Sequence, residues 1–164
     1  MRRRLLLIPF LLAIGSACQS TPPLAHAFRS SESLANEVLD AFARKDRTRL
    51  EQLALGESEF RDHVWPDLPA SRPERNLPFS YVWGDLHQKS RIALATALAK
   101  HGGKRYVLKH VTFAGESRYD HYLVHRAAAF DVVDTSNTAV TLRVAGSFLE
   151  KDGVWKVFSY VVDE

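Results

Sequence analysis

The chain has 164 residues, of which 46% are hydrophobic and 25% charged, a composition typical of one folded domain and not of a disordered chain. Its net charge of +3 comes from Arg2, Arg3 and Arg4, because residues 5–17 contain no charged side chain. The other 19 of the 22 basic residues balance 19 acidic residues, so we expect a neutral domain without a nucleic-acid partner.

Residues 1–17 have the three parts of an export signal: cationic residues 1–4, an apolar run over residues 5–14, and small residues before Cys18. As a helix, the apolar run would span about 15 Å, half of a bilayer core, so we do not expect it to form a stable transmembrane segment. The segment Ile14-Gly15-Ser16-Ala17-Cys18 resembles the lipobox of bacterial lipoproteins.

This resemblance implies that Cys18 becomes the acylated amino terminus of the mature protein and anchors it in a membrane. Gln19 after the cysteine implies sorting to the outer membrane of a bacterial cell envelope, facing the periplasm. A second small-residue site, Ala25-His26-Ala27, is the alternative, and its use would release a soluble periplasmic protein. Residues 18–30 are predicted to form a tether.

Two helices are predicted first. Apolar residues recur with helical spacing from Leu34 to Phe42, which predicts a helix over residues 31–45. Asp46 is the expected cap of a second, shorter helix that ends at Gly56. The basic residues of this region are interpreted as solvated helix ends, with contact to anionic lipid as the alternative: Arg44, Lys45, Arg47 and Arg49.

Four prolines between residues 66 and 78 mark an irregular crossing. A long helix is then expected to begin between Phe79 and Asp85, with a stripe of apolar and small residues that includes Leu94. Gly102-Gly103 is predicted to end it.

Four antiparallel strands are predicted over residues 105–114, 118–133, 138–150 and 154–162, because β-branched and aromatic residues alternate there between short turns. Asp152-Gly153 is the strongest of these turn signals. With Gly115-Glu116 as the first turn, His110 is expected to lie opposite His121. Val144, Phe148 and Val157 are expected on the core face of the last hairpin.

This order predicts an α+β fold, with two or three N-terminal helices packed on a curved four-stranded antiparallel sheet. From residue 31 to the end, the chain resembles the nuclear-transport-factor-two-like family, a cone of helices on a sheet. The resemblance rests on the first helix followed by Asp46, the Gly102-Gly103 break, and the closing Asp152-Gly153-Val154-Trp155 segment. It implies a pocket between helices and sheet but no particular activity.

Six residues are the candidate lining of a mixed polar and apolar pocket: Tyr106, His110, Tyr119, His121, His125 and Trp65. A surface or homodimer patch is the alternative interpretation of the same face. No metal site is predicted, because no acid or cysteine stands beside the expected pair of His110 and His121 to complete a ligand set. No cofactor motif is present either.

No converged catalytic set is visible in the sequence. The sequence therefore predicts a lipid-anchored envelope protein of non-catalytic type, which binds a small apolar ligand or a partner protein. The alternative is a small hydrolase or isomerase that acts in the cone pocket.

Overall fold

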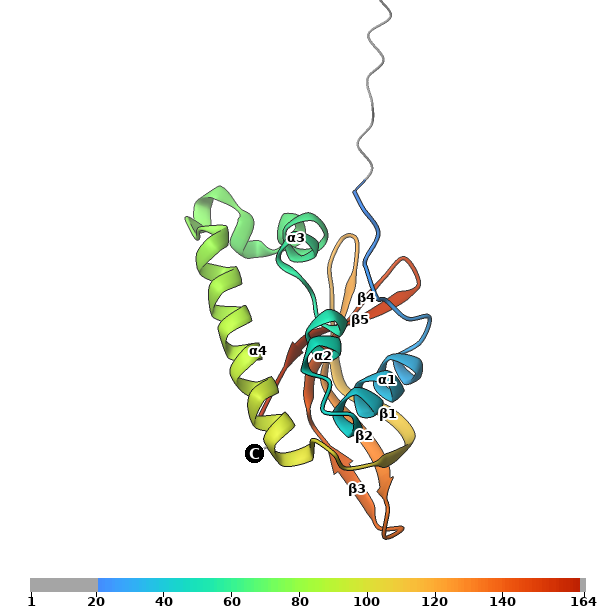
Figure 1. Ribbon diagram of the computed structural model, residues 1–164. Coiled ribbons are helices and arrows are strands. Elements are labelled where there is room, and N and C mark those ends of the chain that lie inside the picture. Colours follow the sequence, from blue (N-terminus) through green and yellow to red (C-terminus); the bar gives the residue numbers. More distant parts are fainter. Residues whose placement is uncertain (1–20, 163–164) are drawn as a thin grey trace, which may run out of the picture.

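The computed structural model describes residues 21–162 (Figure 1). Four α-helices come first: α1 (Ser31–Ala43), α2 (Arg47–Leu53), α3 (Glu57–Glu59) and α4 (Phe79–His101). A π-helical turn (Phe60–Val64) and short 3-10 turns connect α3 to α4. Five strands follow: β1 (Tyr106–Arg118), β2 (Leu123–Asp134), β3 (Ala139–Leu142), β4 (Ala145–Lys151) and β5 (Val154–Tyr160). The predicted signal peptide and Cys18 lie outside the described residues.

The α+β class is confirmed, with the helices preceding a single antiparallel sheet of order β1-β2-β4-β5. The strand predicted over residues 138–150 is two strands, because residues 143 and 144 interrupt it. Both pieces pair with β2, β3 beside its second half and β4 beside its first half. Ala127 of β2, with a left-handed φ of 50°, lies between the two paired halves.

Local signals mark three helix boundaries as predicted, whereas α1 ends at Ala43 and α2 at Leu53, before the predicted ends at residues 45 and 56. The Asp46 side chain accepts a hydrogen bond from the backbone N–H of Arg49 at 2.9 Å and so caps α2. Helix α4 begins at Phe79 and ends at the glycine pair, where Gly103 adopts a φ of 84° that suits a residue without a Cβ.

The predicted first turn of the sheet is wrong. β1 continues through Gly115 to Arg118, and the chain turns over residues 119–122 instead. Gly115 lies inside the strand opposite Arg126 of β2, and a Cβ there would lie 2.7 Å from the terminal guanidinium nitrogen of that flexible side chain. His110 consequently lies opposite Asp131, and the predicted pair of His110 with His121 does not form.

The main core fills the space between the sheet and helices α1, α2 and the C-terminal half of α4. Leu34, Leu94 and Phe148 belong to it, and the partly buried Trp155 packs against it. The next residue of β4, Leu149, points to the opposite face, where a second cluster contains Phe60 of the π-helical turn and Trp83 of α4. Helix α4 therefore contributes to cores on both faces of the sheet.

The two edges of the sheet differ. Three segments cover β5: Phe28 exchanges two backbone hydrogen bonds with Trp155 (2.9 and 2.7 Å), Leu55 donates its N–H to Val157 at 3.0 Å, and the Ser90 hydroxyl accepts the N–H of Tyr160 at 3.0 Å. No strand among the described residues pairs with the outer edge of β1, although β1 has 13 residues. The fold therefore protects one edge and leaves the other open.

Candidate functional site

The six predicted pocket residues do not line one pocket. Tyr106, at the start of β1, lies 3.1 Å from His101 of α4 through its hydroxyl and packs against the main core. His110 is exposed, with its Nε2 2.7 Å from the carboxylate of Asp131. Tyr106 begins the 13-residue strand β1, and Tyr119 directly follows its last residue. The two tyrosines therefore lie at opposite ends of the strand.

His125 lies beside two aromatic rings on the core side of the sheet. Its ring stacks on Trp155 with centroids 4.5 Å apart and contacts Phe113 at 5.1 Å. Its Nε2 is 2.8 Å from Glu150, and its Nδ1 is 3.8 Å from Glu116. Because both ring nitrogens face carboxylates and only 14% of the side chain is exposed, His125 is held in place and not presented to a ligand.

Trp65, Tyr119 and His121 gather at one end of the molecule. Trp65 and Tyr119 pack against the second core cluster, and Tyr119 stacks on Tyr122 at 4.6 Å. His121 lies in the β1–β2 turn next to them, with its Nδ1 2.9 Å from Asp67. Three of the six predicted residues are thus brought together. They come from the β1–β2 turn and from the 3-10 turn at Trp65, and not from one strand face.

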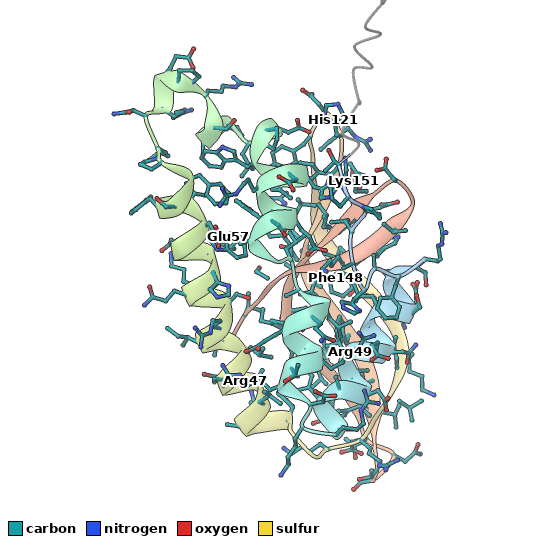
Figure 2. The ribbon with its side chains drawn as sticks, turned by 45° about the horizontal axis from the view of Figure 1, so that its top comes forward. Arg47, Arg49, Glu57, His121, Phe148 and Lys151 are labelled. Atoms are coloured by element: carbon teal, nitrogen blue, oxygen red, sulfur yellow. The ribbon has the colours of Figure 1, made fainter. Side chains whose placement is uncertain are left out.

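A cleft of about 690 Å³ opens at this end. Its walls are the first described residues, the π-helical segment and the turns β1–β2 and β4–β5. Six of the titratable side chains in its walls could bind a polar ligand: Arg29, Asp62, His63, Asp67, His121 and Lys151. Figure 2 shows His121 and Lys151 close together at this end, and the Lys151 Nζ donates a hydrogen bond to the His121 carbonyl at 3.1 Å.

Asp67 orients His121. The carboxylate of Asp67, only 9% exposed, accepts the backbone N–H of His121 at 2.9 Å and also contacts its Nδ1. The ring itself is 70% exposed and carries its Nε2 away from that contact. This is the arrangement of a general base with an orienting acid, but within residues 21–162 no hydroxyl or thiol forms a hydrogen bond with the ring.

The segment predicted as a tether is packed on the domain wherever it is described. The Pro22 carbonyl lies 2.8 Å from His63 Nε2, the Ala25 N–H donates to Glu59 at 2.8 Å, and Phe28 joins the edge of β5. We call residues 21–29 the strap. It is held because it supplies backbone groups to the otherwise open edge of β5.

A buried ion pair fastens the strap, and sequence reasoning missed it. Lys156 is 2% exposed, and its Nζ donates to Glu59 at 2.9 Å and to the Ala25 carbonyl at 2.6 Å. Burial lowers the pKa of Lys156, although the hydrogen bond to Glu59 raises it in part. The available signal was a lysine in the middle of β5, a strand whose two faces are both covered.

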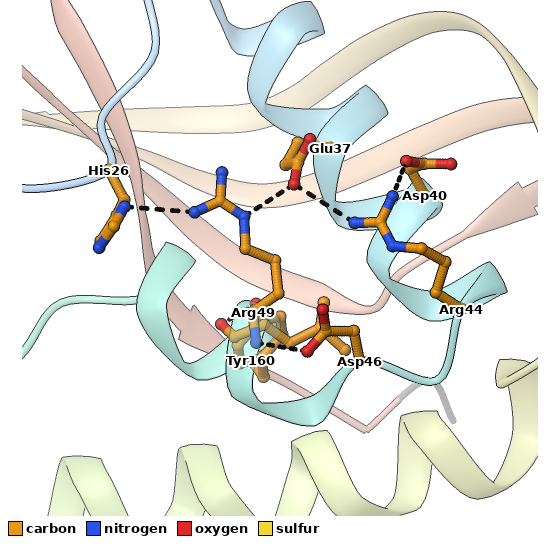
Figure 3. A network of polar contacts seen from close by, with 8 residues as sticks. His26, Glu37, Asp40, Arg44, Asp46, Arg49 and Tyr160 are labelled. Carbon is orange, nitrogen blue, oxygen red and sulfur yellow. Dashed lines mark hydrogen bonds and ion pairs between the residues drawn. The ribbon is translucent and has the colours of Figure 1, made fainter.

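Ion pairs hold the three arginines of the predicted basic cluster to acids of α1 and α2: Arg44 with Asp40 and Glu37, Arg47 with Glu51, and Arg49 with Glu37. Arg49 also lies 3.2 Å from His26 of the strap (Figure 3). These guanidinium groups therefore have partners within the domain, which favours the interpretation as helix charges over contact with lipid.

We expect alkaline pH to destabilise the domain through two buried tyrosines. The hydroxyl of Tyr160 donates to the Leu50 carbonyl at 2.7 Å, and that of Tyr122 to the Val64 carbonyl at 3.2 Å. Burial raises the pKa of both above the ordinary 10.0. Because the pKa is raised in the folded state, the two tyrosines contribute fully to the free energy of unfolding below about pH 10. This contribution is lost as the pH rises further.

Urea unfolding of the wild type and of Tyr160→Phe between about pH 8 and 11 checks this. At neutral pH the variant should be less stable than the wild type by about 1–3 kcal/mol, because the buried Leu50 carbonyl loses its hydrogen-bond donor. As the pH rises, the variant should lose less stability than the wild type. Parallel curves for both proteins would contradict the assignment.

Comparison with protein-family models, curated proteins and solved structures finds no match to this chain. Across residues 21–162, no helix is long and apolar enough to cross a membrane. In the same residues, no three His, Cys, Asp or Glu side chains gather as ligands for one metal ion.

Proposed function

We propose that this chain is a bacterial lipoprotein, anchored through an acylated Cys18 in the outer membrane and facing the periplasm. Its domain is of the nuclear-transport-factor-two-like kind and binds a partner protein without catalysis. The partner adds an extended segment to the open edge of β1. Support comes from the export signal before Cys18, from the order of helices before one antiparallel sheet, and above all from the unpaired edge.

The filled interior argues for a protein partner over a small apolar ligand. The apolar hollow between α4 and β5, lined in part by Trp83, Leu86 and Phe158, has a volume of about 50 Å³. Ligand pockets usually measure about 300–1,000 Å³. Phe148 and Phe130 are fully buried where the family's pocket is expected, between helices and sheet.

The open edge of β1 is the single observation that carries the proposal. Exposed strand edges present unpaired N–H and C=O groups, which a partner strand can satisfy. Residues 111–115 of this edge, Val-Thr-Phe-Ala-Gly, carry no charge, and Val107 nearby is 62% exposed. A register shift next to Lys109 interrupts the edge on one side, which limits indiscriminate pairing.

Replacing Cys18 by serine tests the anchor. Wild-type protein should fractionate with membranes, and the Cys18→Ser variant should move to the soluble fraction, because a lipoprotein signal cannot be acylated without its cysteine thiol. An unchanged membrane fraction would contradict the anchor but would leave the binding proposal standing.

Photo-crosslinking in the native cells tests the edge. A photoreactive residue at Thr112 or Ala114 of β1 should yield one dominant adduct, whereas the same residue at exposed Ile92 of α4 should not. Thr112→Lys should reduce capture by a second probe at Ala114, because an added lysine discourages strand pairing. Equal adducts at β1 and α4 would contradict the proposal. An adduct of twice the chain's own mass would identify the partner as a second copy.

A further inference from the structure

The strap places the proposed lipid anchor at one end of the domain. Cys18 precedes Thr21 by three residues, which span about 11 Å at most when fully extended. From Pro22 to Phe28, the strap is bonded to His63, Glu59 and β5. Acyl chains on Cys18 can therefore enter a membrane only near the end where the described chain begins (Figure 1).

The 690 Å³ cleft lies at that same end, because Thr21 and Leu24 are part of its wall. The turns β1–β2 and β4–β5 form its other side, whereas the β2–β3 turn lies at the opposite end of the molecule (Figure 1). A domain held this closely to its anchor turns the cleft toward the lipid headgroups.

The cleft offers charges of both signs. Arg29 has no acidic partner, and Asp62 no basic one, among the residues that the structure describes. Lys151 adds a second cation, and its Nζ lies 3.9 Å from the carboxylate of Asp152 in the β4–β5 turn. His63 and His121 lie between them with ring nitrogens already directed to Pro22 and Asp67.

We propose that this cleft binds the zwitterionic headgroup of a phospholipid in the anchoring membrane, of the phosphoethanolamine class. Arg29 and Lys151 contact the phosphate, and Asp62 accepts hydrogen bonds from the primary ammonium. The inference rests on the acylated Cys18 of the proposed function and is independent of the partner at β1. Anchoring keeps headgroups at high local concentration, so exposed ion pairs of modest strength suffice.

The test uses acylated full-length protein in phosphatidylcholine vesicles that contain brominated lipid as a short-range quencher. A fluorophore is attached at Asp120→Cys in the β1–β2 turn or, as a control, at Ser136→Cys in the β2–β3 turn. The first probe should be quenched and the second should not. Quenching by brominated phosphatidylethanolamine should exceed that by brominated phosphatidylcholine or phosphatidylglycerol by about two- to fivefold.

Arg29→Gln and Asp62→Asn should each abolish the preference for phosphatidylethanolamine. Arg47→Gln, which removes one cation from α2 instead, should keep it, and thermal unfolding of each variant confirms that it is folded. Soluble phosphoethanolamine should compete, and inorganic phosphate should not compete equally.

Equal quenching of the two probes would overturn the orientation. Equal quenching by all three lipids, stronger quenching by anionic phosphatidylglycerol, or equal competition by inorganic phosphate would overturn the headgroup assignment. Failure of the wild-type protein to enter vesicles would instead refute the anchor itself, so the two failures are distinguishable.

Discussion

Replacing Phe148 by alanine should lower the free energy of unfolding by about 3–5 kcal/mol. The side chain is fully buried, and its ring lies 5.7 Å from that of Phe113 and 5.9 Å from that of Phe130. Its removal leaves a cavity between the sheet and the helices that close-packed neighbours fill only in part. Urea unfolding measures the loss, and Val107→Ala on the exposed side of β1 should change stability by less than about 0.5 kcal/mol.

The same variant also tests the filled interior on which the proposed function rests. An apolar cavity of this kind stays dry and takes up benzene or xenon. Benzene should therefore raise the melting temperature of the Phe148→Ala variant and leave that of the wild type unchanged. Comparable stabilisation of the wild type would reveal a ligand cavity in the native domain and would favour a small apolar ligand over a protein partner.

Glu59→Gln should destabilise the domain by about 3–5 kcal/mol, because it leaves the ammonium of Lys156 buried without its counter-charge. The double variant Glu59→Gln with Lys156→Met should be more stable than Glu59→Gln alone, since no unpaired charge then remains. Urea unfolding of the wild type, both single variants and the double variant gives the coupling energy. Additive losses would contradict a buried pair.

Lys156 also has a pH signature. Because burial lowers its pKa, the unfolded chain binds this proton more readily than the folded one. Its contribution to stability therefore rises as the pH approaches the ordinary value of 10.5, opposite in sign to the loss expected from Tyr122 and Tyr160. Lys156→Met should remove this rise, and an unchanged profile would argue against a buried charged lysine.

Local patterns in the sequence determined most of the elements. The stripe from Leu34 to Phe42 specifies α1, the Asp46 side chain caps α2, and the glycine pair ends α4. The alternation around Phe148 also identified a core face correctly. Each of these follows from interactions within a few residues or from the period of one element, which a sequence displays directly.

The register of the first hairpin was beyond such reasoning. Gly115-Glu116 looks like a turn, yet both residues lie inside β1, where they pair with Arg126 and His125 of β2. The error moved His110 to Asp131 and separated it from His121, so the predicted pocket divided into unrelated places. A register depends on both strands and on where they pack, and one strand's sequence does not contain it.

By itself, the sequence determined the class of the fold, the helix starts, the end of α4 and a core face of the sheet, because these depend on short-range periodicity and capping. Only the tertiary structure decided that Asp67 meets His121 across 54 residues and that Lys156 meets Ala25 across 131. It also decided that the strap covers β5 while β1 stays open. The physical reason is that these contacts join distant segments, whose meeting depends on how the sheet and helices pack as a whole.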